Sequence, residues 1–247
     1  MEERKAGLHD EDPRSSLGEG DDMPLDEHVT DTVQTGDGDL AITHLGHASL
    51  LFTHGGKRIY IDPYSRFADY ANLPDADIVL ITHAHYDHLD PRAIAKIRRD
   101  TADIVHPERC AKRIKGGIVM RNGDVQVIHG FRIEAIPSYS LGPRWKMGSL
   151  HPSGHGNGYV IEFANLRVLV AGDTHAIPEL KGQVGIDVAF LPLRAPFAMS
   201  PQMLADVALA MKPKILYPYH RSEAETRRLI DLLKDHPEID LRIRPRR

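Results

Sequence analysis

Residues 77–90 read DIVLITHAHYDHLD. The first half of this stretch is short, apolar and rich in β-branched residues, which predicts a buried strand. The second half places three histidines and an aspartate within six positions, directly where that strand should end. Residues two apart on an extended chain point the same way, so His83 and His85 can bind one ion. Asp87 and His88 are adjacent and diverge, so they can serve a second ion beside the first.

The ligand types in this stretch narrow the choice of metal. Imidazole and carboxylate without thiolate suit zinc, iron(II) or manganese(II), and zinc is the default among them. The alternative interpretation is a polar loop that happens to be rich in histidine. Because the motif has the strand context that such a site requires, the stretch predicts a metal site.

The run HAHYDH at residues 83–88 resembles the His-x-His-x-Asp-His signature of the metallo-β-lactamase superfamily. The resemblance extends from near Gly38 to the last predicted helix, with further fixed points at Gly46-His47, Gly172-Asp173-Thr174 and His220. It implies a four-layer αββα sandwich of two mixed β-sheets, with the metal site at one edge between the sheets. The predicted elements agree, because about twelve short strands with helices in both halves favour two packed sheets under outer helices.

We predict the strands and helices from the periodicity of apolar residues and from the residues typical of turns and helix caps. Strands are predicted at residues 40–45, 49–53, 57–62, 76–82, 103–106, 125–128, 131–136, 159–163, 166–171, 187–191, 214–218 and 241–243. Helices are predicted at residues 91–99 and 107–115, from Pro201, and from Glu223 after a capping box at Ser222.

Composition sets the broad class of the protein. The chain has 247 residues, 41% hydrophobic and 27% charged, which is typical of a soluble globular protein of one large or two small domains. No apolar run approaches the roughly 18 residues of a membrane span, and the N-terminus lacks a signal-peptide core. The single cysteine, Cys110, excludes an internal disulfide and fits a reducing compartment. We therefore expect a cytoplasmic protein.

Charge is unevenly distributed along the chain. Residues 1–36 hold 11 Asp/Glu against 3 Lys/Arg, a net charge of −8, whereas the remaining residues carry a net +4. We expect residues 1–36 to form an acidic, mobile extension, with a short helix-like piece around Pro24 to Val33, and residues 37–247 to form the hydrolase domain. The near-neutral body has no basic stripe, which argues against a nucleic-acid partner.

A catalytic centre with two metals needs about three protein ligands per ion and an open position for water. Asp173 and His220 each follow a predicted strand and match the later motifs of the superfamily. The stretch LHPSGHGNGY, residues 150–159, looks like the His-Pro…Gly-Tyr segment of hydrolases related to L-ascorbate-6-phosphate lactonase and N-acyl-phosphatidylethanolamine phospholipase D. On that resemblance His151 is a metal ligand, and His155 is the alternative.

The resemblance thus implies a complete ligand set for two Zn²⁺ ions, with Mn²⁺ or Fe as alternatives. The first ion is assigned His83, His85 and His151; the second is assigned Asp87, His88 and His220; Asp173 bridges them. Two such ions lower the pKa of a shared water from 15.7 towards about 7. The expected function is a hydrolase whose metal-bridged hydroxide attacks an ester, lactone or phosphodiester of a small, anionic substrate.

Three residues near this centre receive supporting roles. Asp87 is expected both to ligate metal and to orient the nucleophile or carry its proton. His175 lies two residues after Asp173 and is a second catalytic candidate, because function concentrates in loops just past strand ends. His47 follows the early glycine of the resemblance, and we expect it to hydrogen-bond a ligand carboxylate.

Five residues are candidate substrate contacts. Arg144 and Trp145 lie in a loop before His151 that is either a lid for an anionic or amphipathic substrate or an ordinary surface loop. Arg194 is either an anion contact or a surface salt-bridge partner. His155 is a further candidate. Tyr139 precedes a serine where relatives often have asparagine, so the substrate of a relative cannot be transferred.

Other functions remain in competition. The first is an iron-dependent oxidoreductase of the sulfur dioxygenase type on the same fold, against which the intact second ligand group argues. A nuclease would need a phosphate track, and a non-catalytic relative would have lost ligands. The expected partner is a small molecule, and the sequence leaves open the substrate, the native metal, a homo-oligomer and the role of residues 1–36.

Overall fold

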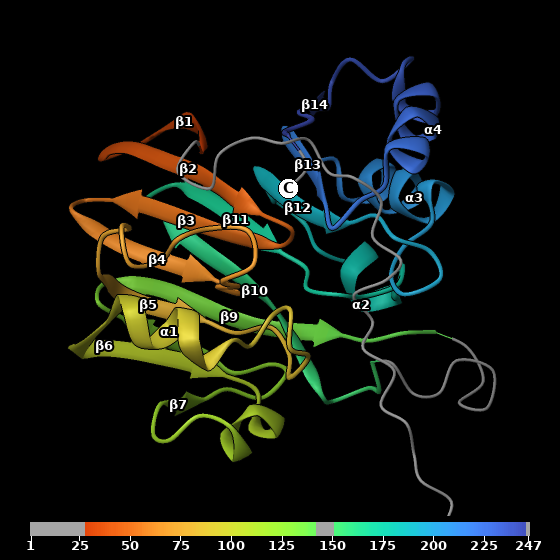
Figure 1. Ribbon diagram of the computed structural model, residues 1–247. Coiled ribbons are helices and arrows are strands. Elements are labelled where there is room, and N and C mark those ends of the chain that lie inside the picture. Colours follow the sequence, from red (N-terminus) through yellow and green to blue (C-terminus); the bar gives the residue numbers. More distant parts are fainter. Residues whose placement is uncertain (1–27, 142–150, 246–247) are drawn as a thin grey trace, which may run out of the picture.

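Two seven-stranded β-sheets pack face to face in the computed structural model, which describes residues 28–141 and 151–245 (Figure 1). The first sheet contains β1 (Val29–Thr35), β2 (Gly38–Gly46), β3 (Ser49–His54), β4 (Lys57–Ile61), β5 (Ala76–Leu80), β6 (Arg98–His106) and β7 (Ile118–Val119). The second contains β8 (Val125–Ile128), β9 (Phe131–Ser138), β10 (Gly156–Phe163), β11 (Leu166–Val170), β12 (Val188–Pro192), β13 (Ile215–Tyr219) and β14 (Asp240–Leu241).

Both sheets have the same organisation. Strands follow each other in chain order across each sheet. The first four strands of each sheet pair antiparallel, and the last three continue in parallel. The sheets are therefore mixed, as the sequence predicted, and the carboxyl ends of their parallel strands share an edge.

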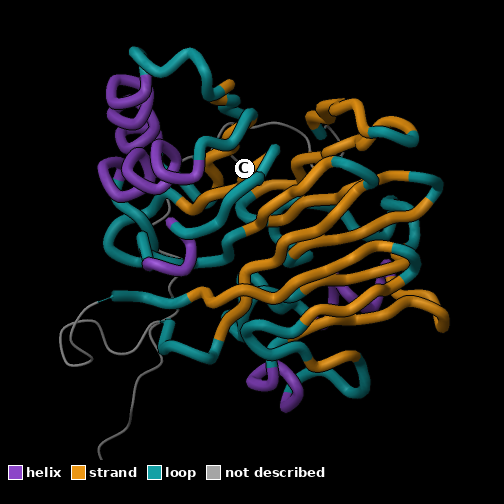
Figure 2. Tube along the Cα trace, turned by 180° about the vertical axis from the view of Figure 1, so that it is seen from behind, coloured by secondary structure: helices purple, strands orange, loops and turns teal. Residues whose placement is uncertain are grey.

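Helices cover the outer faces of the sheets. Helix α1 (Pro91–Ile97) lies over the first sheet, whereas α2 (Pro178–Lys181), α3 (Pro201–Met211) and α4 (Glu223–Leu233) lie beside the second (Figure 1). Seen from behind, the strands run side by side and the two longer helices lie together at one end (Figure 2). The predicted helix over residues 107–115 is instead a short 3₁₀ segment, η2 (Glu108–Lys112).

Three of the four predicted helix starts are confirmed, those of α1, α3 and α4. The N-cap side chains accept backbone hydrogen bonds that the first turn leaves unpaired, Asp90 from Arg92, Ser200 from Met203 and Ser222 from Glu225. A proline at the first position of α1 and α3 has the helical φ already fixed and needs no partner for its nitrogen.

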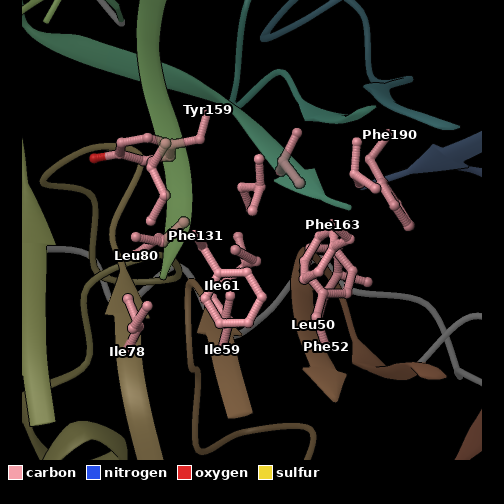
Figure 3. Packing of buried hydrophobic residues seen from close by; sticks show 14 of the residues in the cluster. Leu50, Phe52, Ile59, Ile61, Ile78, Leu80, Phe131, Tyr159, Phe163 and Phe190 are labelled. Carbon is pink, nitrogen blue, oxygen red and sulfur yellow. The ribbon is translucent and has the colours of Figure 1, made fainter. Parts of the chain in front are cut away.

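Buried apolar side chains form three hydrophobic clusters. Between the sheets, Phe52 and Ile61 of the first sheet point toward Phe163 and Phe190 of the second (Figure 3). Burying a side chain of this size contributes about 2 kcal/mol. A second cluster joins the second sheet to α3 and α4, and a third joins the first sheet to α1. The predicted αββα sandwich is confirmed.

The N-terminal part of the described chain differs from the prediction. Residues 29–35 form strand β1, which pairs antiparallel with β2 at the edge of the first sheet, instead of a helix-like piece in an extension. The sheet thus begins before residue 36, and residues 1–27 of the predicted extension lie outside the described residues. The strand was missed because its inward-facing positions alternate Val29, Asp31, Val33, so a carboxylate interrupts the apolar period.

The inward-facing Asp31 ties the two ends of the described chain together. Its carboxylate accepts two hydrogen bonds from the Arg244 guanidinium, at 2.6 and 2.7 Å, and one from the Tyr217 hydroxyl at 3.0 Å. Burial would raise the pKa of Asp31, but these bonds outweigh it and hold that pKa below its ordinary value. The bidentate pair therefore joins β1 to the segment that follows β14.

This pair can be tested by unfolding. Asp31→Asn leaves the partly buried Arg244 without its counter-charge, so we expect the free energy of unfolding in urea to fall by about 2 kcal/mol. Asp37→Asn is the matched control, because Asp37 is 65% exposed beside His54 and should change stability by less than about 0.5 kcal/mol. Equal effects of the two variants would show that the pair does not stabilise the fold.

Candidate metal centre

Five stretches that follow strands meet at one edge between the sheets. Asp62 follows β4, residues 82–90 follow β5, and Asp173 and His220 follow β11 and β13. His151 lies in the connection between β9 and β10, which pair with each other beside β11. Parallel strands end at the same edge of a sheet, so these side chains, remote in sequence, become neighbours.

The first group of ligand atoms is formed by three imidazoles. Nδ1 of His85 lies 3.0 Å from Nε2 of His83 and 3.2 Å from Nε2 of His151. Nitrogens about 2.0–2.1 Å from a tetrahedral zinc are roughly 3.3 Å apart, so this spacing fits one ion. Burial lowers the pKa of His151 to about 4 and that of His83 well below its ordinary value, which favours the neutral, metal-binding form. His155 does not belong to this group.

The second group surrounds the Asp173 carboxylate. Oδ2 of Asp173 lies 3.5 Å from Nε2 of His88 and 3.6 Å from Nε2 of His220. The same oxygen is 3.8 Å from Nε2 of His151 in the first group. Oδ2 of Asp87 lies 3.7 Å from Nε2 of His220. Asp173 therefore sits between the two groups, which is the position that a bridging carboxylate would occupy.

The electrostatics of the second group favour a cation. Burial opposes ionisation of Asp173, but the surrounding imidazoles outweigh it and hold the pKa of Asp173 well below its ordinary value. Burial likewise lowers the pKa of His88, yet the Asp173 and Asp62 carboxylates raise it above its ordinary value on balance. A field that stabilises a proton at His88 also stabilises a metal cation there.

Several buried atoms in this group have no hydrogen-bond partner. They are Nε2 of His88, both ring nitrogens of His220 and Oδ1 of Asp173. Each buried polar atom left unpaired costs about 1–3 kcal/mol, so a cluster of them aimed at one region needs a partner. Nitrogen and oxygen donors without thiolate suit Zn²⁺, Mn²⁺ or Fe²⁺. The residues present thus fit divalent cations.

Asp62 orients His88 and was missed by the sequence analysis. Oδ2 of this fully buried carboxylate lies 2.7 Å from Nδ1 of His88, which turns the opposite nitrogen toward Asp173. The Thr82 backbone N–H and hydroxyl also donate to Asp62, at 2.7 and 2.6 Å. The available signal was its position at the end of a predicted strand, the same position that identified Asp173.

Other partners orient the remaining rings. The Thr82 hydroxyl lies 3.0 Å from Nδ1 of His83, and the Ser140 hydroxyl lies 3.2 Å from Nδ1 of His151. Each bond leaves Nε2 of the ring directed at the first group. Nε2 of His47 lies 3.1 Å from Oδ2 of Asp87, which is the contact the sequence predicted for it.

Arg113 holds the loop that carries the motif. Its guanidinium donates to the carbonyl oxygen of Ala84 at 2.6 Å and to that of Leu89 at 3.1 Å. The two carbonyls bracket residues 85–88, so one side chain fixes both ends of the ligand-bearing turn. Nothing in the local sequence around Arg113 pointed to this role.

Some predicted site residues take other places. Both ring nitrogens of His175 are engaged by backbone, Nδ1 accepting from Leu141 at 3.0 Å and Nε2 donating to the Pro196 carbonyl at 3.2 Å. This ring bridges the two loops that carry Leu141 and Pro196, and its catalytic role stays a prediction. The Tyr139 hydroxyl bonds Glu179 at 3.1 Å. The Arg194 guanidinium makes no ion pair within the described part of the chain. Arg144 and Trp145 lie outside the described residues.

The fold and the ligand groups together define the class of protein. Residues 41–220 match the family model described as the beta-lactamase superfamily domain. The chain therefore belongs to this superfamily, and its fold is the metallo-β-lactamase fold.

The curated relatives narrow the family. A UPF0173 metal-dependent hydrolase of Thermococcus kodakarensis is 32% identical over 195 residues, covering 72% of this chain and 83% of that protein. One of Nanoarchaeum equitans is 30% identical over 188 residues, covering 73% and 83%. This chain is accordingly a member of the UPF0173 metal-dependent hydrolase family.

Two solved structures have the same fold as this chain. A crystal structure of a metal-dependent hydrolase from Parabacteroides distasonis is 42% identical, with a TM-score of 0.84, and covers 90% of this chain and 100% of that one. A metallo hydrolase from Ignicoccus hospitalis, 21% identical with a TM-score of 0.68 over 83% and 95% of the two chains, shares the fold. In the described part of the chain, no helix is both long and apolar enough to cross a membrane.

The role of Asp62 gives a first prediction for the site. In Asp62→Asn, an amide NH₂ group replaces the carboxylate oxygen that accepts the hydrogen bond from Nδ1 of His88. Two donors then face each other, so His88 loses its fixed orientation. We expect zinc affinity, measured by competition with a chelator, to fall about 10- to 100-fold. Asp75→Asn, which alters a surface pair with Arg99, is the control and should leave the affinity unchanged. Equal affinity of Asp62→Asn and wild type would contradict the role assigned to Asp62.

The role of the Arg113 guanidinium gives a second prediction for the site. Arg113→Met removes both bonds to the loop, and Arg113→Lys can replace only one of them, because an ammonium lacks the planar fork. We expect both variants to bind zinc several-fold more weakly, by about 1 kcal/mol, and to exchange the amide hydrogens of His88 and Leu89 faster. Arg109→Met, on the exposed side of η2, which Arg113 directly follows, is the control. Full activity and slow exchange in Arg113→Met would refute this role.

Proposed function

We propose that this protein is a binuclear, zinc-dependent hydrolase that cleaves an ester, lactone or phosphodiester in a small, anionic molecule. One observation carries the proposal. The buried Asp173 carboxylate lies within 3.8 Å of imidazole nitrogens from both ligand groups, among buried atoms that have no hydrogen-bond partner. Such an arrangement supports a bridging ligand between two cations.

The proposed ligands are those that the sequence suggested. His83, His85 and His151 would hold one ion, Asp87, His88 and His220 would hold the other, and Asp173 would bridge them. When bound, two divalent cations supply Lewis acidity and lower the pKa of a water held between them.

The residues of the chain supply orientation and proton handling. His47 donates to Oδ2 of Asp87, which keeps this carboxylate in one orientation at the more exposed side of the site. Burial raises the pKa of Asp87, but the nearby His220 imidazole, at 3.7 Å, and the bond with His47 outweigh this and hold that pKa below its ordinary value. Asp87 can therefore orient an attacking water and accept a hydrogen bond from it, a role that contributes about a hundredfold or more in rate.

The environment of the proposed centre bears on the side from which substrate would enter, on the substrate chemistry and on the cellular compartment. His88 and Asp173 are almost fully buried, whereas His85 and Asp87 retain partial exposure, so substrate would enter from their side. The resemblance of residues 150–159 supports a substrate chemistry like that of the lactonase and phospholipase D relatives. The single, buried Cys110 supports a cytoplasmic enzyme, and the near-neutral charge of residues 37–247 supports a small-molecule substrate rather than nucleic acid.

Metal content and hydrolysis test the proposal together. We expect wild type to contain about two zinc or manganese ions per chain and to hydrolyse aryl esters or bis(p-nitrophenyl) phosphate, and Asp173→Ala to lose most of both. The control is Asp231→Ala on the exposed side of α4, which should match wild type. One iron per chain with no hydrolysis would favour the iron-dependent oxidoreductase instead, and absence of metal after chelator-free preparation would refute the centre.

A further inference from the structure

A row of aromatic rings leads from the metal centre to the surface. Tyr86 occupies the position between His85 and Asp87 in the motif and is 58% exposed. Its ring meets that of Tyr64 edge-on, with centroids 6.1 Å apart, and Tyr64 meets Phe67 in the same way at 5.7 Å. We call Tyr64, Phe67 and Tyr86 the aromatic wall.

The inner end of the wall contacts a residue that orients the centre. The ring of Phe67 is stacked on that of His47, with an interplanar angle of 10° and centroids 5.6 Å apart. His47 in turn bonds Asp87 at 3.1 Å, and its ring centroid is 3.9 Å from that of His220. The wall therefore adjoins the second ligand group directly.

A cation accompanies the wall. The guanidinium of Arg66 lies over Phe67, 5.8 Å from the ring centroid, on the loop between β4 and β5. Arg66 is exposed, and it has no carboxylate in ion-pair contact within the described residues. A guanidinium of this kind can bind an anionic oxygen while its face stays on an aromatic ring.

The exposure of Tyr86 is not explained by packing. Single exposed apolar residues are ordinary on protein surfaces. Tyr86, however, is the outer member of a contiguous row that reaches the ligands, and its neighbours on both sides in the chain are proposed ligands. An aromatic row with one open face suits a planar ring that stacks or packs edge-on against it.

We propose that the aromatic wall and Arg66 form a subsite for an aromatic ring of an anionic substrate, which makes the substrate class aryl-bearing esters of carboxylic or phosphoric acids. This inference rests on the proposed hydrolase function. The ring would lie against Tyr86 and Tyr64, and Arg66 would face the negative charge of the substrate.

The test compares two phosphonates that differ only in the ring. Phenylphosphonate and cyclohexylphosphonate are titrated by calorimetry into the zinc-loaded protein, and the metal content of each sample is measured. They have similar size and charge, but only the first has an aromatic face. We expect wild type to bind the phenyl compound about 2- to 10-fold more tightly, the range that aromatic contacts contribute beyond buried area.

Variants of Tyr86 test whether the preference for the phenyl compound arises at the aromatic wall. Tyr86→Leu should bind both phosphonates with nearly equal affinity, whereas Tyr86→Phe should keep the preference. The control is Phe197→Leu, because Phe197 is 43% exposed on the segment after β12 and lies outside the wall. It should behave as wild type.

The outcomes separate this inference from the function on which it rests. A zinc-loaded wild type that binds the two phosphonates equally would overturn the subsite and leave the hydrolase standing. Loss of the preference in Phe197→Leu but not in Tyr86→Leu would place the ring elsewhere and also overturn it. A protein that holds no metal would refute the hydrolase and the subsite together.

Discussion

A carboxylate buried among imidazoles, with no proton donor to satisfy it fully, is the feature on which the rest of this structure depends. Asp173 is 4% exposed, yet its Oδ1 has no hydrogen-bond partner, and the same holds for Nε2 of His88. Taking such groups out of water costs several kcal/mol each. The cost is tolerable only if a cation completes the cluster, so the fold and the proposed centre stabilise each other.

The backbone is also shaped by this cluster. Among the described non-glycine residues, six have a positive φ, and three of them are His47, Asp62 and His220. Each of these three lies just past a strand, where the left-handed conformation turns the side chain sharply toward the centre, at an energetic cost of order 1 kcal/mol. Gly172, at φ +65°, reaches a position where a Cβ would lie 2.9 Å from the Ser138 hydroxyl. Half of the positive-φ positions therefore carry a proposed ligand or a residue that orients one, and the other three, His129, Ala164 and Lys212, lie elsewhere.

How much of this was readable from the sequence depends on the range of the interaction. The ligand-bearing turn was predictable, because a β-branched run followed by alternating histidines needs only local geometry. Strand β1 was not, because its inward Asp31 makes sense only with Arg244, 213 residues away. Asp62 and Arg113 were missed for the same reason, since their partners lie 20 or more residues away in the sequence. The backbone contacts of His175 could not be foreseen either, because a loop position next to a ligand does not reveal which way a ring points.

The geometry of the motif also explains where specificity can reside. Residues 84–88 form a turn after β5, closed by bonds from the His88 and Leu89 amides to the His85 carbonyl, and this turn brings His85, Asp87 and His88 into the ligand groups. Ala84 is held at its carbonyl by Arg113, whereas Tyr86 projects to the surface beside Tyr64. A change at Tyr86 therefore alters the surface next to the reacting centre without removing a ligand. A substitution at this position would change the proposed aromatic subsite while every proposed metal ligand is kept.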